Sequence, residues 1–515
     1  MSKANRTLKN IFTVGAFTSL SRVLGLVREM LQSRLIGAGV AQSAFTLAFA
    51  IPNMARKLFG EGALTAAFVP VFKSEVEAEA FESARRLARA VMSMSLMMLS
   101  AVVALVFIGC GFAESCEGAF AGSERMQLTF SLVKTLLPYM IFICGAAFGM
   151  GVLNALGRFK AASAMPCILN VFWIGILVWI WFNPGTDVAA RVKTVAWAIL
   201  AAGAAQFAFM LWRMHASGYT PGFTFRGWRD EKVRIVWRNT VIAAVGAGAV
   251  QINCMLDQVL AQKASPWAAG VIGYAERLMD LPLGVIGVAF GTVLLPTFSG
   301  FFARGDVNGA KSAFSSSLTN MMLLMLPASA GLFILAPEVT SVIYEGNAFD
   351  STATVRVSRA LAVYSLGLAF FGYQKSIVPW FQAQKDVKTP LAVAVKTVFL
   401  NAFLNVLAVF LLPVEWRHVG LAASTVFCSA VGGVMLTVTA VRRNGALGFS
   451  SAAPRLLRIA AATVLMAAAL CFAKDALADL PLLVRLSALV AAGAAVFAFS
   501  ALALGLRRCV RVRGK

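Results

Sequence analysis

The sequence has 515 residues, of which 59% are hydrophobic and only 13% are charged, whereas about 25% of the residues of a soluble domain carry charge. This composition excludes an ordinary soluble fold, and the apolar excess recurs in stretches of about 20 residues, the length that a helix needs to cross a bilayer. A net charge of +23 would suggest nucleic-acid binding in a soluble protein. Here basic loops between membrane spans explain it, so no nucleic-acid partner is expected.

Apolar segments between polar breaks predict an all-α integral membrane protein with about fourteen transmembrane helices. They lie near 8–36, 43–71, 90–112, 128–156, 162–182, 192–214, 239–263, 270–302, 315–336, 356–383, 391–412, 418–441, 457–473 and 482–506. No charged leader with a cleavage site precedes the first segment, so the N-terminus is expected to be retained.

The longest polar break divides the predicted spans into six and eight. It covers 217–238 and contains the basic amphipathic stretch GWRDEKVRIVWR, which is typical of a cytoplasmic linker at a lipid surface. The resulting domains are an N-lobe at 1–216, a C-lobe at 239–445, and two further spans with a basic tail at 446–515.

The two predicted lobes resemble each other weakly. TAAFVPVF at 65–72 and GTVLLPTF at 291–298 both close a long span with proline in the same place. Duplicated halves are common in transporters.

Lys and Arg are concentrated in alternate loops, and the positive-inside bias makes those loops cytoplasmic. Both termini then lie inside, which requires an even number of spans and agrees with fourteen.

Eight scattered cysteines without a CxxC pair are interpreted as small core residues. Cys110 and Cys116 flank an outer loop, and whether they pair is left open. The chain also lacks a GxxxxGK[ST] nucleotide loop and HExxH or GxSxG motifs. The sequence therefore predicts a transporter, not an enzyme.

Charged residues inside the spans concentrate at corresponding positions of the two lobes, and each is costly in a membrane. They are Arg22, Arg28, Glu29, Arg34, Arg56, Lys57 and Glu61 in the first two spans, and Asp257, Glu276, Arg277 and Asp280 in the seventh and eighth. Several arginines around a water-filled cleft suit a pyrophosphate, because guanidinium groups bind phosphate oxygens in bidentate fashion. The alternative is a set of structural ion pairs or snorkelling side chains, which is favoured for Arg34 and Lys57.

Asp257 stands in the middle of the seventh span without a basic neighbour one turn away. Asn401, Asn405 and the Ser424–Thr425 pair on later spans offer oxygen atoms that suit a hard cation. These polar residues equally suit hydrogen bonds between helices, and a proton-carrying role for Asp257 also stays open.

Three long strings resemble the MurJ (MviN) lipid II flippase family of the multidrug/oligosaccharidyl-lipid/polysaccharide exporter superfamily. They are SRVLGLVRE at 21–29, IPNMARKLFGEGALTAAFVPVF at 51–72 and YAERLMDLPLGVIGVAFGTVLLP at 274–296, with a weaker match, FQAQKDVKTP, at 381–390. The resemblance implies fourteen helices, two six-helix lobes around a central cavity, and two extra helices forming a groove for the undecaprenyl tail.

The same resemblance implies roles for single residues. Arg22, Arg28, Arg56 and Arg277, with Ser21, look like contacts for the lipid II pyrophosphate and sugar. Glu29, Glu61, Glu276 and Asp280 look like gating or ion-pair partners, and a sodium site described in some members falls at Asp257, Asn401, Asn405 and Thr425. This chain departs from the family pattern at Lys57, Glu276 and Asp280, where charge is kept, and at Ser43 and Asn405, where an acid is missing.

The expected function is translocation of lipid II to the outer leaflet of the bacterial inner membrane by alternating access, with both termini cytoplasmic. The expected cofactor is none, apart from coupling to sodium or protons. Expected partners are lipid II and membrane lipids around a working monomer, with the cell-wall synthesis machinery as a further candidate. The alternatives are an exporter of another polyprenyl-linked or anionic substrate and a non-transporting scaffold of that machinery.

Overall fold

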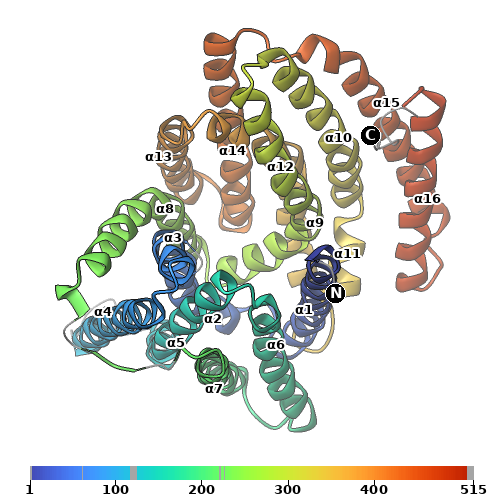
Figure 1. Ribbon diagram of the computed structural model, residues 1–515. Coiled ribbons are helices and arrows are strands. Elements are labelled where there is room, and N and C mark those ends of the chain that lie inside the picture. The colour runs from blue at the N-terminus through green and yellow to red at the C-terminus, as the bar shows by residue number, and fades with distance from the viewer. Residues whose placement is uncertain (1–2, 61, 116–123, 220–221, 225–226, 507–515) are drawn as a thin grey trace. The chain divides into compact units, whose positions relative to one another are not determined.

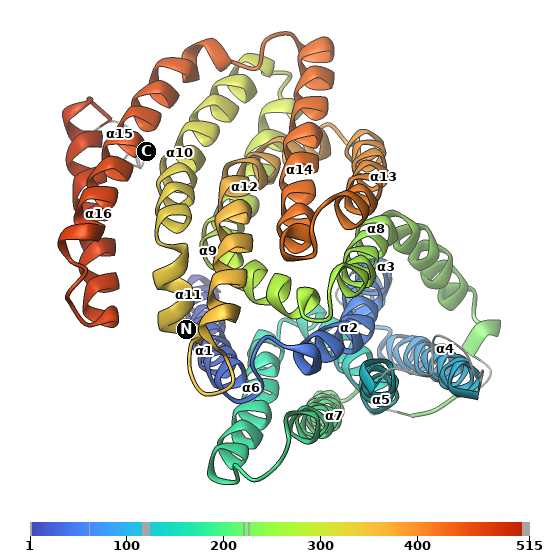
Figure 2. The ribbon, with the colours of Figure 1, turned by 180° about the vertical axis from the view of Figure 1, so that it is seen from behind.

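The computed structural model describes residues 3–60, 62–115, 124–219, 222–224 and 227–506, and Figures 1 and 2 show its helices from opposite sides. The helices of the first half are α1 (Lys3–Ile36), α2 (Val40–Ala55), α3 (Ala63–Glu77), α4 (Phe81–Ser115), α5 (Glu124–Ala155), α6 (Phe159–Phe182), α7 (Val188–His215) and α8 (Glu231–Ala264). Those of the second half are α9 (Ala268–Ala303), α10 (Val307–Ile334), α11 (Ala336–Tyr344), α12 (Ser351–Ala383), α13 (Lys388–Leu411), α14 (Val414–Asn444), α15 (Phe449–Ala476) and α16 (Leu482–Ala503). A π-helical segment, Arg56–Gly60, follows α2 and precedes α3, and a 3-10 turn, Gly227–Arg229, precedes α8.

The all-α membrane fold expected from the composition is confirmed. Each predicted span overlaps one long helix, except that α2, the π-helical segment and α3 together make the second and that α11 is additional. Ten of the helices within the described residues are long and apolar enough to cross a bilayer. The count of fourteen membrane crossings stays a prediction.

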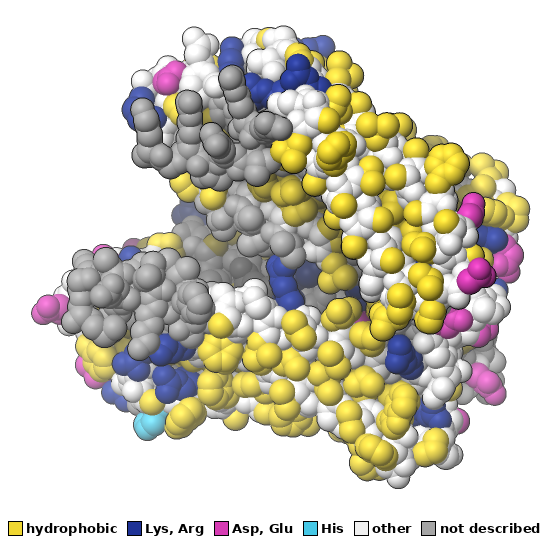
Figure 3. All heavy atoms as spheres, turned by 90° about the vertical axis from the view of Figure 1, so that its right-hand side faces the viewer, with side chains coloured by type: hydrophobic (Ala, Val, Ile, Leu, Met, Phe, Trp, Pro, Cys, Tyr) yellow, Lys and Arg dark blue, Asp and Glu magenta, His cyan; other side chains and the backbone are white. Residues whose placement is uncertain are grey.

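Hydrophobic side chains cover most of the described surface that Figure 3 shows, and charged side chains gather mainly near its margins. Among the exposed apolar residues are Phe410, Phe472 and Phe499, each more than three-quarters exposed. In water such a surface would be unstable, so these faces are suited to lipid.

The chain divides into two compact units. The first comprises Met1–Val259 with the short segment Gly346–Phe349, and the second comprises Leu260–Glu345 and Asp350–Lys515. The chain passes from one to the other inside α8. The lobes predicted on either side of 217–238 were defined by sequence alone and stay a prediction.

In the first unit α5 is the central helix and packs against α2, α4 and α7. Leu132, Leu136 and Phe148 of α5 are fully buried. Gly203 lets α7 approach closely, because a Cβ atom there would lie 2.4 Å from Cδ2 of Tyr139. Small residues at helix crossings are the usual means of close packing inside a membrane.

The second predicted span is interrupted where the sequence predicts one continuous helix. Pro52 lies within α2 and lacks an amide hydrogen, and the backbone then widens into the π-helical segment at Arg56–Gly60 before α3 begins. Such π segments occur often at functional sites. Here the segment carries Arg56 and Lys57.

The helical part of the predicted linker packs onto the first unit. Val233 and Val236 of α8 are fully buried in its core, and Lys232 forms an ion pair of 2.7 Å with Glu75 at the end of α3. The hydrogen bond from Lys232 holds the pKa of Glu75 below its ordinary value. This part of the stretch is therefore the first turns of α8.

In the second unit α12 is central and packs against α9, α10 and α14. Trp380 of α12 is fully buried between Phe298 and Phe314, with ring centroids 5.6 and 5.8 Å away. These rings join α9, α10 and α12 into one core.

The C-terminal hairpin of α15 and α16 is tied to α11 by a cluster of charges. Glu338, only 6% exposed, pairs with Lys474 of α15 at 2.9 Å and with Arg485 of α16 at 3.5 Å. Lys474 also donates to the carbonyl oxygen of Ile334.

Replacing this carboxylate is expected to loosen the hairpin. Glu338→Ala leaves two cations facing each other, which costs an amount at the lower end of about 3–5 kcal/mol because both cations are partly exposed. Thermal unfolding in detergent should show a lower midpoint for Glu338→Ala, whereas Asp479→Ala in the exposed turn before α16 should not shift it. Equal midpoints for Glu338→Ala and wild type would contradict this role.

Candidate functional site

Arg28 is the most enclosed of the predicted cavity arginines, and α1 and α6 place it together with its partners. Its Nη1 donates to Oδ1 of Asn170 at 3.0 Å, and its Nη2 donates to Oε1 of Glu29 at 2.5 Å. Its guanidinium carbon lies 4.3 Å from the ring centroid of Trp173, a distance at which a cation is attracted to the face of the ring. The side chain is 17% exposed.

A chain of buried polar side chains continues from this arginine. Nε1 of Trp173 donates to Gln32 at 2.8 Å, and Nε2 of Gln32 donates to Oε1 of Gln42 on α2 at 3.0 Å. All three residues are at most 3% exposed. Because buried polar groups are costly unless they are bonded, this chain fixes the ring on which Arg28 rests.

Ser21 belongs to the same cluster. Nδ2 of Asn170 donates to the backbone oxygen of Ser21 at 3.1 Å and lies 3.4 Å from its hydroxyl. Asn170 therefore links the α1 turn that carries Ser21 to the turn that carries Arg28. The structure thus brings together three predicted site residues of α1, namely Ser21, Arg28 and Glu29.

The other first-unit candidates lie elsewhere on the same unit. Arg22 is exposed on α1, and Arg56 donates from Nη2 to Oδ1 of Asn53 at 3.0 Å within the π-helical region. Glu61 lies outside the described residues, as does Cys116, the proposed partner of Cys110. Arg34 is half-buried, and its side chain packs against Gly346 of the short segment that belongs to this unit.

In the second unit, α9 carries the matching candidates. Oε1 of Glu276 accepts a hydrogen bond from the hydroxyl of Tyr364 on α12 at 3.2 Å. Arg277, the next residue, is half-buried, and Asp280 one turn later is exposed. Each unit thus carries an arginine next to a glutamate on a long helix, as the sequence positions predicted.

The predicted sodium ligands fall into different units. Asp257 accepts from Asn253 at 3.2 Å on α8, in the first unit. In the second unit Asn401 and Asn405 are buried, and Nδ2 of Asn405 donates to Oδ1 of Asn401 at 3.0 Å. The Thr425 hydroxyl donates to the carbonyl of Leu421. Amide and hydroxyl oxygens of this kind are suitable ligands for a hard cation.

Sequence reasoning missed Asn170, Trp173 and Gln32, which surround Arg28. The available signal was an amide inside an apolar run, because such a group needs a partner in a membrane. It also missed Lys375, an exposed cation within α12 whose side chain lies 3.8 Å from the Cβ position of Gly287 on α9. A lone lysine in the run SLGLAFFGYQKSIVPW carried the same kind of signal.

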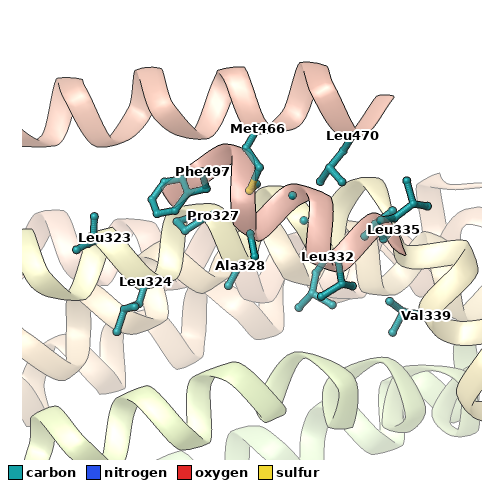
Figure 4. Close-up of a pocket in the computed structure, with 15 residues that line it drawn as sticks. Leu323, Leu324, Pro327, Ala328, Leu332, Leu335, Val339, Met466, Leu470 and Phe497 are labelled. Carbon is teal, nitrogen blue, oxygen red and sulfur yellow. The ribbon is translucent and has the colours of Figure 1, made fainter. Parts of the chain in front are cut away.

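An apolar groove of about 380 Å³ lies within the second unit between α10, α11, α15 and α16 (Figure 4). Leu324, Leu332, Met466 and Phe497 are among the side chains that line it. Both C-terminal helices contribute, so the groove depends on the hairpin that Glu338 ties to α11.

Comparison with known proteins connects these features to one family. The family model described as lipid II flippase MurJ matches residues 32–487. The chain belongs to the MurJ lipid II flippase family. It is therefore a multi-span protein of the bacterial inner membrane and a member of a family of transporters, not of enzymes.

Individual relatives agree over most of the chain. A protein of Rhizobium meliloti named probable lipid II flippase MurJ is 32% identical over 97% of this chain and 94% of its own length. The lipid II flippase MurJ of Burkholderia cenocepacia is 30% identical over 80% of each chain. A solved structure of lipid II flippase MurJ in an inward closed conformation matches with a TM-score of 0.76 at 22% identity, covering 97% of this chain and 99% of its own.

The fold is shared more widely. An inward-facing multidrug resistance transporter of the MATE family matches with a TM-score of 0.71 at 16% identity over 84% of this chain. Fold alone therefore does not separate a lipid flippase from a drug exporter. The chemistry of the charged sites has to do so.

Proposed function

We propose that this protein carries the head group of lipid II from the cytoplasmic to the outer leaflet by alternating access, with Arg22, Arg28, Arg56 and Arg277 binding its pyrophosphate and sugar. Besides family membership, the main observation that supports the proposal is the environment of the enclosed Arg28. Asn170 and Glu29 fix two of its nitrogens, and its Nε is buried without a hydrogen-bond partner among the described residues. An anionic oxygen would satisfy that donor.

Charge separates this substrate from a cationic drug. From Ser21 onward, the described residues of α1 and the π-helical segment carry Arg22, Arg28, Arg34, Arg56 and Lys57 against the single acid Glu29. Excess positive charge attracts a pyrophosphate and repels a cation. Another polyprenyl-linked anion is the second candidate substrate and fits the same charges.

The groove of Figure 4 supports a site for the polyprenyl tail of the same substrate. Its lining is almost wholly apolar, with residues of α10 and α16 along its walls, which suits part of a polyprenyl chain that stays in the membrane while the head group crosses. Glu29, Glu61, Glu276 and Asp280 would then exchange ion-pair partners as the cycle proceeds. A monomer suffices for this scheme, and partners in the cell-wall machinery are compatible with it.

The experiment that tests the function is complementation of a bacterium depleted of its own lipid II flippase. Wild type should restore growth and outer-leaflet lipid II, measured by labelling of intact cells, and Arg277→Ala at equal membrane abundance should not. Growth without exposed lipid II would point to the scaffold alternative. Exposure of a different polyprenyl-linked precursor would identify that precursor as the substrate in place of lipid II.

Sodium coupling is proposed for the oxygen atoms of Asp257, Asn401, Asn405 and Thr425. Replacing Asn401 and Asn405 with Ala together should raise the sodium concentration for half-maximal lipid II exposure roughly tenfold, because about 1.4 kcal/mol of binding is a factor of ten. Thr439→Ala removes a hydroxyl of α14 that bonds the backbone of its own helix and belongs to none of the candidate ligands, so it is the control. If wild type works equally well when choline replaces sodium, a proton or the membrane potential drives the cycle.

A further inference from the structure

A second apolar groove, separate from that of Figure 4, lies within the second unit between α10, α12, α14 and α15. Its volume is about 640 Å³, and it shares no lining residue with the first groove. Leu318, Phe370, Val434 and Leu457 contribute one side chain from each helix. The hydroxyls of Tyr373 and Thr437 hydrogen-bond to each other along its wall, so little polar surface faces its interior.

This groove lies on an exposed apolar face of the second unit. Phe370 is 42%, Val434 62% and Leu457 71% exposed. Surfaces of this kind are suited to an apolar ligand of the bilayer. The chain's own C-terminal residues, RRCVRVRGK at 507–515, are too basic to fill it.

Positive charge gathers at one end of the groove. Lys311 lies on α10 two turns before Leu318 and on the same face, and its Nζ is 3.6 Å from the Cβ position of Gly445 in the turn between α14 and α15. Arg442 is exposed in the last turn of α14, one turn beyond Val438 of the groove wall. Both side chains are long enough to reach the groove mouth.

The start of α15 adds to this charge. The helix begins at Phe449, which lines the groove, and no side chain caps it. The N-terminus of a helix of 28 residues presents unpaired amide hydrogens and a partial positive charge, which favour a phosphate.

The acids near this end are already engaged. Asp386 pairs with Arg443 at 2.5 Å and caps α13 through the backbone nitrogen of Thr389, and Asp306 caps α10. Within the described part of the chain, Lys311 and Arg442 have no acidic partner. The end of the groove therefore has a surplus of positive charge that its own protein does not neutralise.

We propose that this groove holds an acyl chain of an anionic glycerophospholipid, with the phosphate at Lys311, Arg442 and the N-terminus of α15. The apolar walls recognise the chain, and the cations select an acidic head group over a neutral one. By the proposed topology this is a lipid of the cytoplasmic leaflet. The site is distinct from the lipid II groove and does not depend on transport.

Native mass spectrometry of the full-length protein in detergent, titrated with dioleoyl-phosphatidylglycerol or dioleoyl-phosphatidylcholine, tests the proposal. Wild type should bind the anionic lipid several-fold more tightly than the neutral one. Lys311→Gln with Arg442→Gln should bring the two lipids to equal affinity. Ala453→Phe with Ala460→Phe fills the groove from exposed positions of α15 and should weaken both lipids.

Matched controls separate this site from general lipid contact. Ala498 is exposed on α16 and lines neither groove, so Ala498→Phe is the control for the added ring. Lys160→Gln removes a basic charge in the first unit and is the control for the lost cations. Neither should change the preference. Equal binding of both lipids to wild type would overturn the proposal, as would a retained preference in the Lys311→Gln and Arg442→Gln variant or unchanged affinities in the Ala453→Phe and Ala460→Phe variant. Displacement of the phospholipid by undecaprenyl pyrophosphate would assign the groove to the substrate tail.

Discussion

Arg28→Ala is expected to abolish lipid II exposure and complementation while the protein still reaches the membrane. The substitution removes the guanidinium that lies between Trp173, Asn170 and Glu29. A charged hydrogen-bond donor to phosphate contributes about 1.5–3 kcal/mol, so loss of the bond from Nε together with the positive charge reduces transport by roughly a hundredfold. The readout is labelling of outer-leaflet lipid II, normalised to membrane abundance.

The same substitution also leaves the buried Glu29 without this partner, so stability must be separated from function. Arg28→Lys keeps the charge but loses the planar fork, and it should restore abundance with only partial transport. Arg158→Ala removes an exposed arginine in the turn between α5 and α6 and is the matched control. Full transport by a well-expressed Arg28→Ala protein would show that the arginine is structural.

The fold was predictable in outline because bilayer physics allows few solutions. A spanning segment must satisfy its backbone internally, so runs of about 20 apolar residues predict helices. The interruption at Arg56–Gly60 was not predictable, because Pro52 and nearby glycines permit a bend without specifying a π-helical turn. The short helix α11 was likewise not predicted, because it lies in the loop expected between the spans at 315–336 and 356–383.

The charged residues of the candidate site were predictable from the sequence, whereas the residues that hold them in position were not. Arg28 and Glu29 stood out because charge inside a span is costly, and their positions within one apolar helix identified them. Asn170 and Trp173 lie more than 140 residues away, and only the packing of α6 along α1 brings them to Arg28. Periodicity within one helix carries no information about such a pairing.

Asn170→Ala is expected to reduce transport about tenfold without removing any predicted substrate contact. Asn170 accepts a hydrogen bond from Arg28 and donates one to the backbone of Ser21, so it fixes the position of the guanidinium group relative to α1. Loss of a hydrogen bond to a charged group costs about 1.5–3 kcal/mol. Without this bond the side chain of Arg28 is also free to move away from Trp173. Transport should fall because the binding group is no longer preorganised.

A purely structural role for Asn170 would produce a different pattern. Asn170→Asp, which keeps both the size and the acceptor, should retain more transport than Asn170→Ala, because its carboxylate still accepts from Arg28. Asn183→Ala, at an exposed helix end where the amide bonds only the backbone of Trp179, should leave transport unchanged. If Asn170→Ala lowers abundance and transport in equal proportion, the amide stabilises the helix pair and does not position Arg28. A fall in transport at unchanged abundance, with an increased requirement for substrate, would instead show that the network of α6 sets how well α1 holds its anion.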